Sequence, residues 1–215
     1  MKNKLHDYRK LYEKHQLLED EIPTDPFELF HYWLRETETN KEVEEVNTMT
    51  VSTVGLDGFP RSRVVLLKEY DREGLIFYTN YLSEKGKSIE NNPKVSLSFF
   101  WPESERQVHI KGVARKVSDE ESNEYFSSRP RGSQLGAWAS NQSSVIPSRE
   151  FLQKKLELLE KEYENKPIPR PPHWGGYKVI PQEFEFWQGR PNRLHDRISY
   201  SKENELNWKI DRLAP

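Results

Sequence analysis

The chain has 215 residues, and its 33 lysines and arginines nearly balance 35 aspartates and glutamates, which leaves a formal net charge of −2. Such a balance does not favour an extended nucleic-acid-binding face. The sequence contains no cysteine, which excludes disulfides, thiol nucleophiles and sulfur-ligated metal sites. It contains no apolar run long enough for a membrane span or a signal-peptide core, so we expect a cytoplasmic protein that contacts neither membrane nor nucleic acid.

Two helices are predicted in the first 45 residues. Leu5, Tyr8, Leu11 and Tyr12 recur at helical spacing and indicate a short amphipathic helix that needs a partner surface. The second begins after Asp25, because an N-capping aspartate, a proline at the first helical position and a glutamate two residues later are typical of a helix start. Its predicted apolar face consists of Phe27, Phe30, Trp33 and Leu34.

From Thr48 onward the sequence is dominated by β-branched and apolar runs that are separated by turn signals. Strands are predicted at 48–54, 61–69, 75–79, 94–101, 106–117, 176–180, 183–188, 196–201 and 206–212. Two helices interrupt them: one opens with a capping box at Ser118 and Glu121, and the other covers 148–164, with Phe151, Leu152, Leu156, Leu159 and Tyr163 on its apolar side. Closely spaced hairpins favour an antiparallel sheet that closes as a barrel, so the fold class is α+β and mainly β.

Several common catalytic signatures are absent. The sequence lacks the glycine-rich dinucleotide fingerprint, the P-loop, the hydrolase nucleophile elbow and the zincin motif. Its six histidines never pair at i+3 or i+4, so no metal site is expected.

Three polar clusters remain as candidate binding sites. On an extended backbone Arg193, His195 and Arg197 would share one face, which suits an anion or an electron-rich ring, although an exposed strand end held by Asp196 explains the row equally well. The run 61–68 has cations on both sides of an apolar core; they are either ligand groups or protection of a strand edge, and simple alternation puts Arg63 and Lys68 on opposite faces unless the strand is bulged. The stretch 125–144 joins arginines, hydroxyls and a tyrosine without any acid, which favours a phosphate monoester over simple helix capping.

Taken together, these strings resemble the pyridoxine/pyridoxamine 5′-phosphate oxidase family along the whole chain and in the family's order. The matching strings are RVVLLK at 63–68, FYTN at 77–80, ENNP at 90–93, ERQ at 105–107, YFSSRP at 125–130, QSS at 142–144, FWQG at 186–189, RLHDR at 193–197 and DRLAP at 211–215. The resemblance implies an FMN-binding antiparallel split β-barrel with surrounding helices, working as a homodimer with FMN at the subunit interface. It also implies oxidation of pyridoxine or pyridoxamine 5′-phosphate to pyridoxal 5′-phosphate, with molecular oxygen reduced to hydrogen peroxide.

The resemblance also assigns site residues. The expected FMN contacts are Arg63, Val64, Val65, Leu66, Leu67, Lys68, Tyr78, Thr79, Lys85, Gln107, Gln142, Ser143, Trp187 and Arg197. The expected substrate contacts are Lys68, Tyr125, Arg129, Ser133, Arg193, Leu194 and His195, with Arg9 and Tyr12 as an N-terminal pair that covers the active site. Arg193 and His195 are the catalytic candidates, and His195 either takes a proton or only orients the substrate.

The predicted organisation is one domain overall. Residues 1–45 would form a helical segment for a lid and for dimer packing, and 46–215 an FMN-binding split barrel with a helical insertion at 118–164. Two alternatives stay open: a split-barrel flavoprotein that acts on another substrate, and a non-enzymatic protein that binds FMN or pyridoxal phosphate. One departure from the family is Glu84, where relatives often have arginine before the lysine aligned with Lys85; this reversal predicts weaker FMN binding unless Lys87 compensates.

Overall fold

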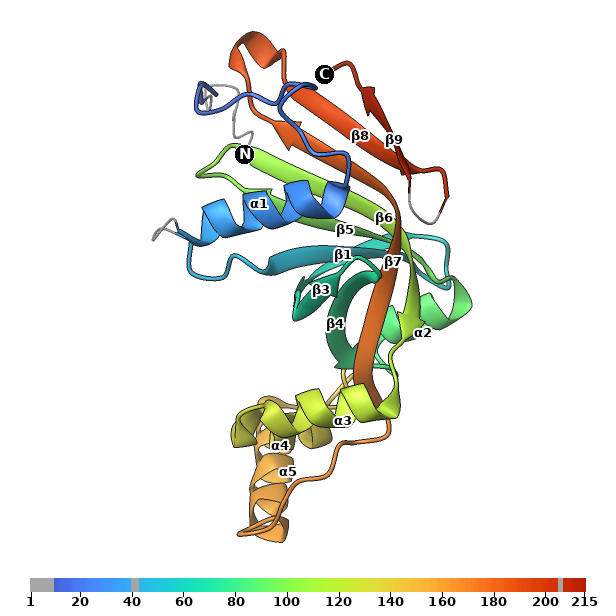
Figure 1. Cartoon of the computed structure of the whole chain (residues 1–215). Coiled ribbons are helices and arrows are strands. Elements are labelled where there is room, and N and C mark those ends of the chain that lie inside the picture. The colour runs from blue at the N-terminus through green and yellow to red at the C-terminus, as the bar shows by residue number, and fades with distance from the viewer. Residues whose placement is uncertain (1–9, 40–42, 205–206) are drawn as a thin grey trace. The chain divides into compact units, whose positions relative to one another are not determined.

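The computed structural model describes residues 10–39, 43–204 and 207–215 (Figure 1). It divides into two compact units, each of which is described by itself. The first unit comprises residues 1–49, 97–111 and 182–215, and the second comprises 50–96 and 112–181. The strands follow the order β2-β1-β5-β6-β7-β4-β3, with β8 on β7 and β9 on β8. β1 (Thr48–Val54), β5 (Lys94–Trp101), β6 (Arg106–Lys116) and β7 (Trp174–Gln188) each contain residues of both units.

The second unit contains the hairpins that precede the candidate site. β2 (Pro60–Leu66), β3 (Glu69–Asp71) and β4 (Gly74–Asn80) follow one another closely, and the Asp71 carboxylate closes the turn before β4 by accepting hydrogen bonds from the amides of Glu73 and Gly74. β4 pairs antiparallel with the first part of β7, with Leu75 opposite Val179.

Four helices complete this unit: α2 (Glu84–Asn91), α3 (Asp119–Ser128), α4 (Arg131–Ala139) and α5 (Arg149–Glu162). α3 begins with the predicted capping box, and Ser148 caps α5. α3, α4 and α5 lie together (Figure 1), over a core of Phe126, Leu135, Ile168 and Trp174. Leu156, Leu159 and Tyr163 pack against this core from α5.

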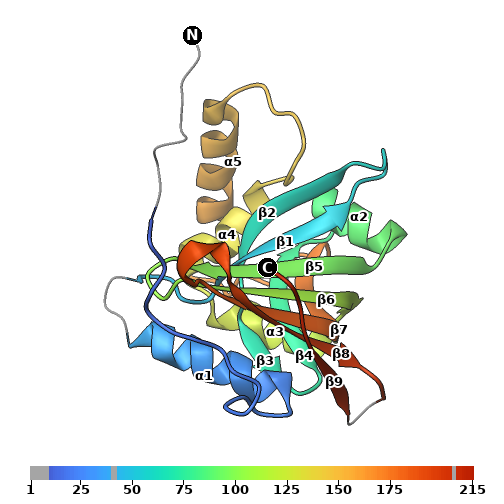
Figure 2. The same cartoon turned by 90° about the horizontal axis from the view of Figure 1, so that it is seen from above.

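In the first unit, an aromatic core lies between α1 (Pro26–Glu38) and the sheet. α1 begins where Asp25 accepts a hydrogen bond from the Phe27 amide, as predicted. Phe27 and Trp33 contact Phe184 and Phe186 edge to face, with ring centroids 5.1 and 5.2 Å apart. Beyond the short helix η1 (Pro191–Arg193), β8 (Asp196–Lys202) pairs antiparallel with the end of β7 and with β9 (Trp208–Arg212) (Figure 2).

Several local expectations were wrong. Leu11 and Tyr12 lie on irregular backbone rather than in a helix, while Leu5 and Tyr8 fall outside the described residues. The run 61–69 ends as a strand at Leu66, the segments 176–180 and 183–188 form one continuous strand, and α2 and α4 were not predicted. None of the apolar residues of α5 is fully buried, and Phe151 remains 49% exposed.

Two further observations bear on function classes. No helix of the part of the chain that the structure describes has the length and apolar character needed to cross a bilayer. The same residues include no cluster of three or more histidine and acidic side chains that could hold a metal ion.

Candidate functional site

A cavity of about 700 Å³ lies in the second unit, between β2, β4 and the helices that follow β6. It brings together residues that are far apart in sequence and that the sequence had assigned to FMN and to the substrate. Its lining includes Val64, Val65, Leu66, Lys68, Tyr78, Thr79, Lys85, Tyr125, Arg129, Ser133 and Gln142. Asn80, Ser140 and Trp174 also line it and were not predicted.

One wall of the cavity is a stack of aromatic rings. The rings of Tyr78 and Tyr125 lie nearly parallel, 3.9 Å between centroids, and Trp174 stacks on Tyr78 at 5.6 Å. Burial, with the nearby carboxylate of Glu69, raises the pKa of Tyr78, so its phenol stays neutral. The wall is therefore flat, neutral and suited to contact with a planar ligand.

Arg129 sits at the end of α3, directly over this wall. Its guanidinium lies 4.5 Å from the ring centroid of Trp174, and burial lowers its pKa. The Nη1 atom is buried and has no hydrogen-bond partner among the described residues. A buried, unsatisfied cationic donor is costly unless it meets an anion, so Arg129 is suited to hold one.

Lys85 provides a second buried cation. Its ammonium donates hydrogen bonds to Thr79 Oγ1 at 3.1 Å and to Gln142 Oε1 at 3.0 Å. Burial first, and then the nearby charge of Arg63, lower its pKa to about 8. Gly86 fixes the start of α2 close to the preceding loop, because a Cβ there would lie 2.1 Å from the backbone oxygen of Tyr81.

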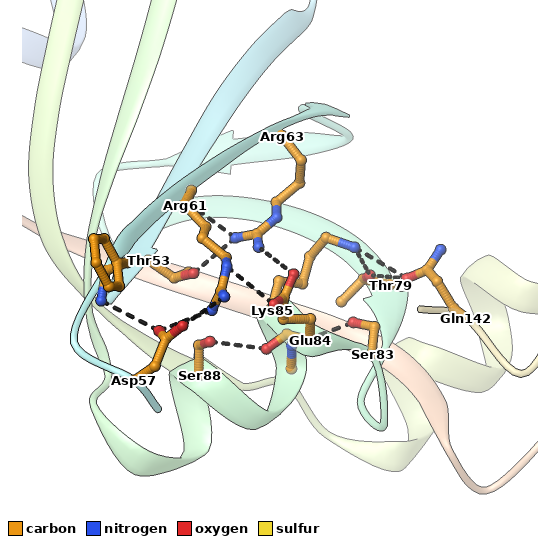
Figure 3. Close-up of polar contacts among 12 residues, drawn as sticks. Thr53, Asp57, Arg61, Arg63, Thr79, Ser83, Glu84, Lys85, Ser88 and Gln142 are labelled. Atoms are coloured by element: carbon orange, nitrogen blue, oxygen red, sulfur yellow. Dashed lines mark hydrogen bonds and ion pairs between the residues drawn. The ribbon is translucent and has the colours of Figure 1, made fainter. Parts of the chain in front are cut away.

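Arg63 approaches Lys85 from β2 (Figure 3). Its Nη1 donates to Thr53 Oγ1 at 2.7 Å and to the backbone oxygen of Arg61 at 3.1 Å. Its Nη2 lies 3.7 Å from the Glu84 carboxylate, which also pairs with Arg61 at 3.0 Å. Glu84 is therefore paired with two arginines.

A neighbouring cavity of about 540 Å³ in the same unit is lined by Asn80, Glu84, Lys87, Ser143 and His173, among others. Ser143 has a left-handed backbone with φ of 71°. Lys87 and Glu84 line the same cavity, but within the described residues Glu84 forms its ion pairs with Arg61 and Arg63.

The first unit has its own cavity of about 430 Å³, which contains the remaining substrate candidates. Tyr12, Trp187, Arg193 and His195 line it, and the ring of Tyr12 packs edge to face on both Trp187 and His195, at 5.8 and 5.7 Å. His195 Nδ1 accepts a hydrogen bond from the Arg190 amide at 3.1 Å, so the neutral ring carries its hydrogen on Nε2. Burial and the charge of Arg193 lower the pKa of His195.

The expected row of Arg193, His195 and Arg197 on one extended face was wrong. Arg193 has a φ of 63° in η1, Leu194 follows with its side chain 69% exposed, and β8 begins only at Asp196. Arg197 instead pairs with Glu185 at 2.8 Å and donates to the Ala214 backbone.

Two of the remaining predicted residues, Gln107 and Leu67, are described and do not line these cavities. Gln107 is on β6 in the first unit, Leu67 is buried beyond the end of β2, and Arg9 lies outside the described residues. Sequence reasoning missed Trp174, Arg61 and Asn80. An alternating strand pattern carries no signal that distinguishes a core tryptophan from one under a ligand site.

The sheet and the cationic, aromatic cavity define a split β-barrel protein with a site suited to planar anions. Residues 36–162 match the family model "Pyridoxamine 5′-phosphate oxidase", and 174–215 match the "Pyridoxine 5′-phosphate oxidase C-terminal dimerisation region". The chain belongs to the pyridoxamine 5′-phosphate oxidase family.

Named relatives and a solved structure agree with this assignment. The chain is 62% identical to a pyridoxine/pyridoxamine 5′-phosphate oxidase of Flavobacterium johnsoniae, over 99% of each chain, and 57% identical to that of Christiangramia forsetii over all of both. It is also similar to PhzG from Burkholderia lata, solved in complex with tetrahydrophenazine-1-carboxylic acid, at 30% identity and a TM-score of 0.84 over 91% of this chain and 95% of that one.

Proposed function

We propose that the protein is a cytoplasmic, homodimeric FMN-dependent oxidase that converts pyridoxine and pyridoxamine 5′-phosphates to pyridoxal 5′-phosphate, with molecular oxygen as the electron acceptor. The observation that carries this proposal is a cavity with an aromatic wall and two separate cations, the buried Lys85 and the half-buried Arg129, whose Nη1 is buried. Two phosphorylated aromatic molecules, a flavin nucleotide and a vitamin phosphate, need two such anchors.

The donor set fits FMN. Arg63 and Lys85 would hold its phosphate, and Gln142 and Thr79, which bind the Lys85 ammonium now, would keep that ammonium oriented. Arg129, Lys68, Ser133 and Tyr125 would hold the substrate phosphate. When bound, FMN supplies the acceptor for the hydride from the substrate C4′ carbon and then returns the electrons to oxygen.

The protein contributes mainly positioning. With both phosphates anchored, the pyridine and flavin rings are confined to one cavity, which converts an encounter in solution into a fixed approach. His195 and Arg193 would orient the substrate: His195, neutral near pH 7 because its pKa is lowered, accepts at Nδ1 and therefore carries its hydrogen on Nε2, where it would donate a hydrogen bond to the substrate. Arg197 would stabilise negative charge on the reduced flavin.

The test is the visible spectrum of the FMN-loaded protein under anaerobic conditions. Addition of pyridoxamine 5′-phosphate should bleach the oxidised flavin band, and admission of air should restore it with release of pyridoxal 5′-phosphate. A spectrum that does not change would contradict the oxidase assignment and leave an FMN-binding protein.

A second candidate is an oxidase of a different planar substrate. The observation in its favour is the similarity to PhzG, whose solved complex contains a tricyclic carboxylic acid rather than a phosphate. The two candidates differ in the use of Arg129 and Ser133. Equal efficiency with pyridoxine and pyridoxine 5′-phosphate would favour the second candidate, since the phosphate anchors would then have no role.

A further inference from the structure

Glu84 binds two arginines at once. Its Oε1 lies 3.0 Å from Arg61 Nε, and its Oε2 lies 3.7 Å from Arg63 Nη2 (Figure 3). Two guanidiniums that share one carboxylate lie within the span of one tetrahedral anion, because a phosphate presents its oxygens at a similar separation.

Arg61 does not need Glu84 to keep its place. Asp57 holds the other side of the guanidinium in a two-bond fork, with Nη1 to Oδ1 at 3.0 Å and Nη2 to Oδ2 at 2.7 Å. Gly55 makes room for this pair, because a Cβ there would lie 2.3 Å from Arg61 Nη1 and 2.6 Å from Asp57 Oδ1. The Nε edge of Arg61 faces Glu84. Because Asp57 holds Nη1 and Nη2, the guanidinium keeps its orientation when the Glu84 carboxylate moves away.

Arg63 is arranged in the same way. Thr53 and the backbone oxygen of Arg61 hold its Nη1, so Nη2 is the donor that points to Glu84. Lys85, the next residue after Glu84 on α2, extends to Thr79 and Gln142 and pairs with no carboxylate in the described part of the chain. Three cations therefore surround the start of α2, and within the described part of the chain the carboxylates paired with them are those of Asp57 and Glu84.

Glu84 differs from the groups around it in its freedom to move. Its side chain is 47% exposed, whereas that of Arg63 is 20% exposed and Lys85 is buried. A half-exposed carboxylate in the first turn of a helix can turn into water at little cost, since its surface ion pairs are weak.

We propose that Glu84 is an exchangeable counter-ion of the FMN phosphate site, and that the phosphate displaces it and recruits Arg61, in addition to Arg63 and Lys85, as a phosphate ligand. This inference rests on the proposed function, since it concerns the phosphate of FMN. Arg61 then supplies a second guanidinium to the phosphate, and Glu84 lowers the affinity by competing for it.

A simpler explanation is that Arg61 only neutralises Glu84, which stabilises α2 through the helix dipole. The two explanations differ in one comparison. If Arg61 binds the phosphate, its removal still weakens FMN binding after Glu84 has been neutralised. If Arg61 only screens Glu84, its removal no longer matters once that carboxylate is gone.

The experiment titrates the full-length apoprotein with FMN and, separately, with riboflavin, and follows the quenching of flavin fluorescence. The variants are Glu84→Gln, Arg61→Gln and the double variant, with Arg115→Gln as a control for loss of one exposed charge on the same unit. Riboflavin lacks the phosphate, so the ratio of its Kd to that of FMN reports the phosphate site alone.

We expect Glu84→Gln to tighten FMN binding several-fold without a change for riboflavin, and the double variant to bind FMN about tenfold more weakly than Glu84→Gln. The gain from Glu84→Gln should shrink at high salt. Equal FMN affinity of Glu84→Gln and the double variant would overturn the role of Arg61, and weaker binding by Glu84→Gln would show that the carboxylate positions the arginines instead of competing. If Arg61→Gln does not fold, Arg61→Met, which also removes the charge, replaces it in the same comparison. A wild-type protein that fails to bind FMN would instead refute the proposed function.

Discussion

At the scale of single residues, the buried ammonium of Lys85 makes FMN binding depend on pH. Its pKa is lowered to about 8, chiefly by burial, and a bound phosphate would raise that pKa again. Protonation of Lys85 therefore accompanies binding above pH 8. We expect the Kd for FMN to be constant with respect to this group below pH 8 and to rise by up to about tenfold per pH unit above it, until the bound-state pKa is passed.

The measurement is a series of FMN and riboflavin titrations between pH 7 and pH 9. Lys85→Met should weaken FMN binding at pH 7 and abolish the pH dependence, while riboflavin binding should show none in either protein. A pH dependence that survives in Lys85→Met would assign it to another group.

We expect Arg129 to lower the free energy of unfolding of the apoprotein, although it provides a binding group for the substrate phosphate. Because Nη1 is buried and none of the described residues pairs with it, Arg129→Met removes an uncompensated desolvation cost. We expect the free energy of unfolding of the apoprotein to be unchanged or raised by about 1 kcal/mol, and kcat/KM for pyridoxamine 5′-phosphate to fall by two orders of magnitude or more, since charge-assisted hydrogen bonds contribute about 1.5–3 kcal/mol each.

Arg131 is the matched control for urea unfolding and steady-state kinetics. Its guanidinium donates to the backbone oxygens of Lys166 and Tyr163, so its role is to tie α4 to the end of α5. Arg131→Met should therefore lower stability and leave kcat/KM close to that of the wild type. If both variants changed the free energy of unfolding in the same direction, the unsatisfied Nη1 donor of Arg129 would not explain the effect of Arg129→Met.

At the scale of elements, capping residues and alternating patterns predicted most boundaries, and the failures have identifiable causes. α1, α3 and α5 begin after Asp25, Ser118 and Ser148, whose side chains accept hydrogen bonds from the first turn. α2 and α4 contain Gly86, Gly132 and Gly136, which lower helix propensity, and their surroundings hold them in place instead. The path of residues 10–17 was not predictable from the local sequence, because it depends on hydrogen bonds to the carboxylate of Glu105, which is far away along the chain.

The candidate site likewise contains features that the sequence predicts and features that it does not. The acid-free composition of 125–144 predicts an anion site, and the structure brings two residues of this stretch, Arg129 and Ser133, into one cavity. The pairing of Glu84 with Arg61 was not foreseen, since position 61 reads as strand-edge protection. The left-handed backbone of Arg193 also has no signal in the sequence, because arginine has no preference for that conformation.

The N-terminal segment of residues 10–17 is held by the buried carboxylate of Glu105. Glu105 accepts hydrogen bonds from the amides of Glu13 and Lys14 at 2.9 and 3.2 Å and pairs with Lys10 at 3.6 Å. This contact places Tyr12 against Trp187 and His195. Glu105→Ala should therefore release the segment and accelerate tryptic cleavage after Lys14 by tenfold or more, as followed by mass spectrometry.

Glu103→Ala provides the comparison, because Lys14 contacts only the backbone oxygen of Glu103. Cleavage at the wild-type rate is expected for that variant. An unchanged rate in Glu105→Ala as well would show that other contacts are sufficient to hold the segment.

At the scale of the whole molecule, the proposed site residues fall into two sets. Lys68, Lys85 and Arg129 belong to the second unit, while Arg193 and His195 belong to the first, which also contains most of the match to the family's dimerisation region. If FMN lies at the subunit interface, each site combines the second unit of one copy with the first unit of its partner. Two inactive variants, one in each set, should then complement each other.

We expect Arg129→Met and Arg193→Ala to be nearly inactive alone and to recover activity when mixed after reversible dissociation. Random reassociation makes half of the dimers mixed, and each mixed dimer contains one site built from two unmodified sets. Recovery should therefore approach about one quarter of the wild-type rate, measured as pyridoxal 5′-phosphate formation at equal total FMN-loaded protein, with light scattering to verify the dimer mass. Mixing two preparations of the same variant is the control. If the mixed dimers form and remain inactive, each site is built within one chain, because both sites of such a dimer would then contain one of the two substitutions.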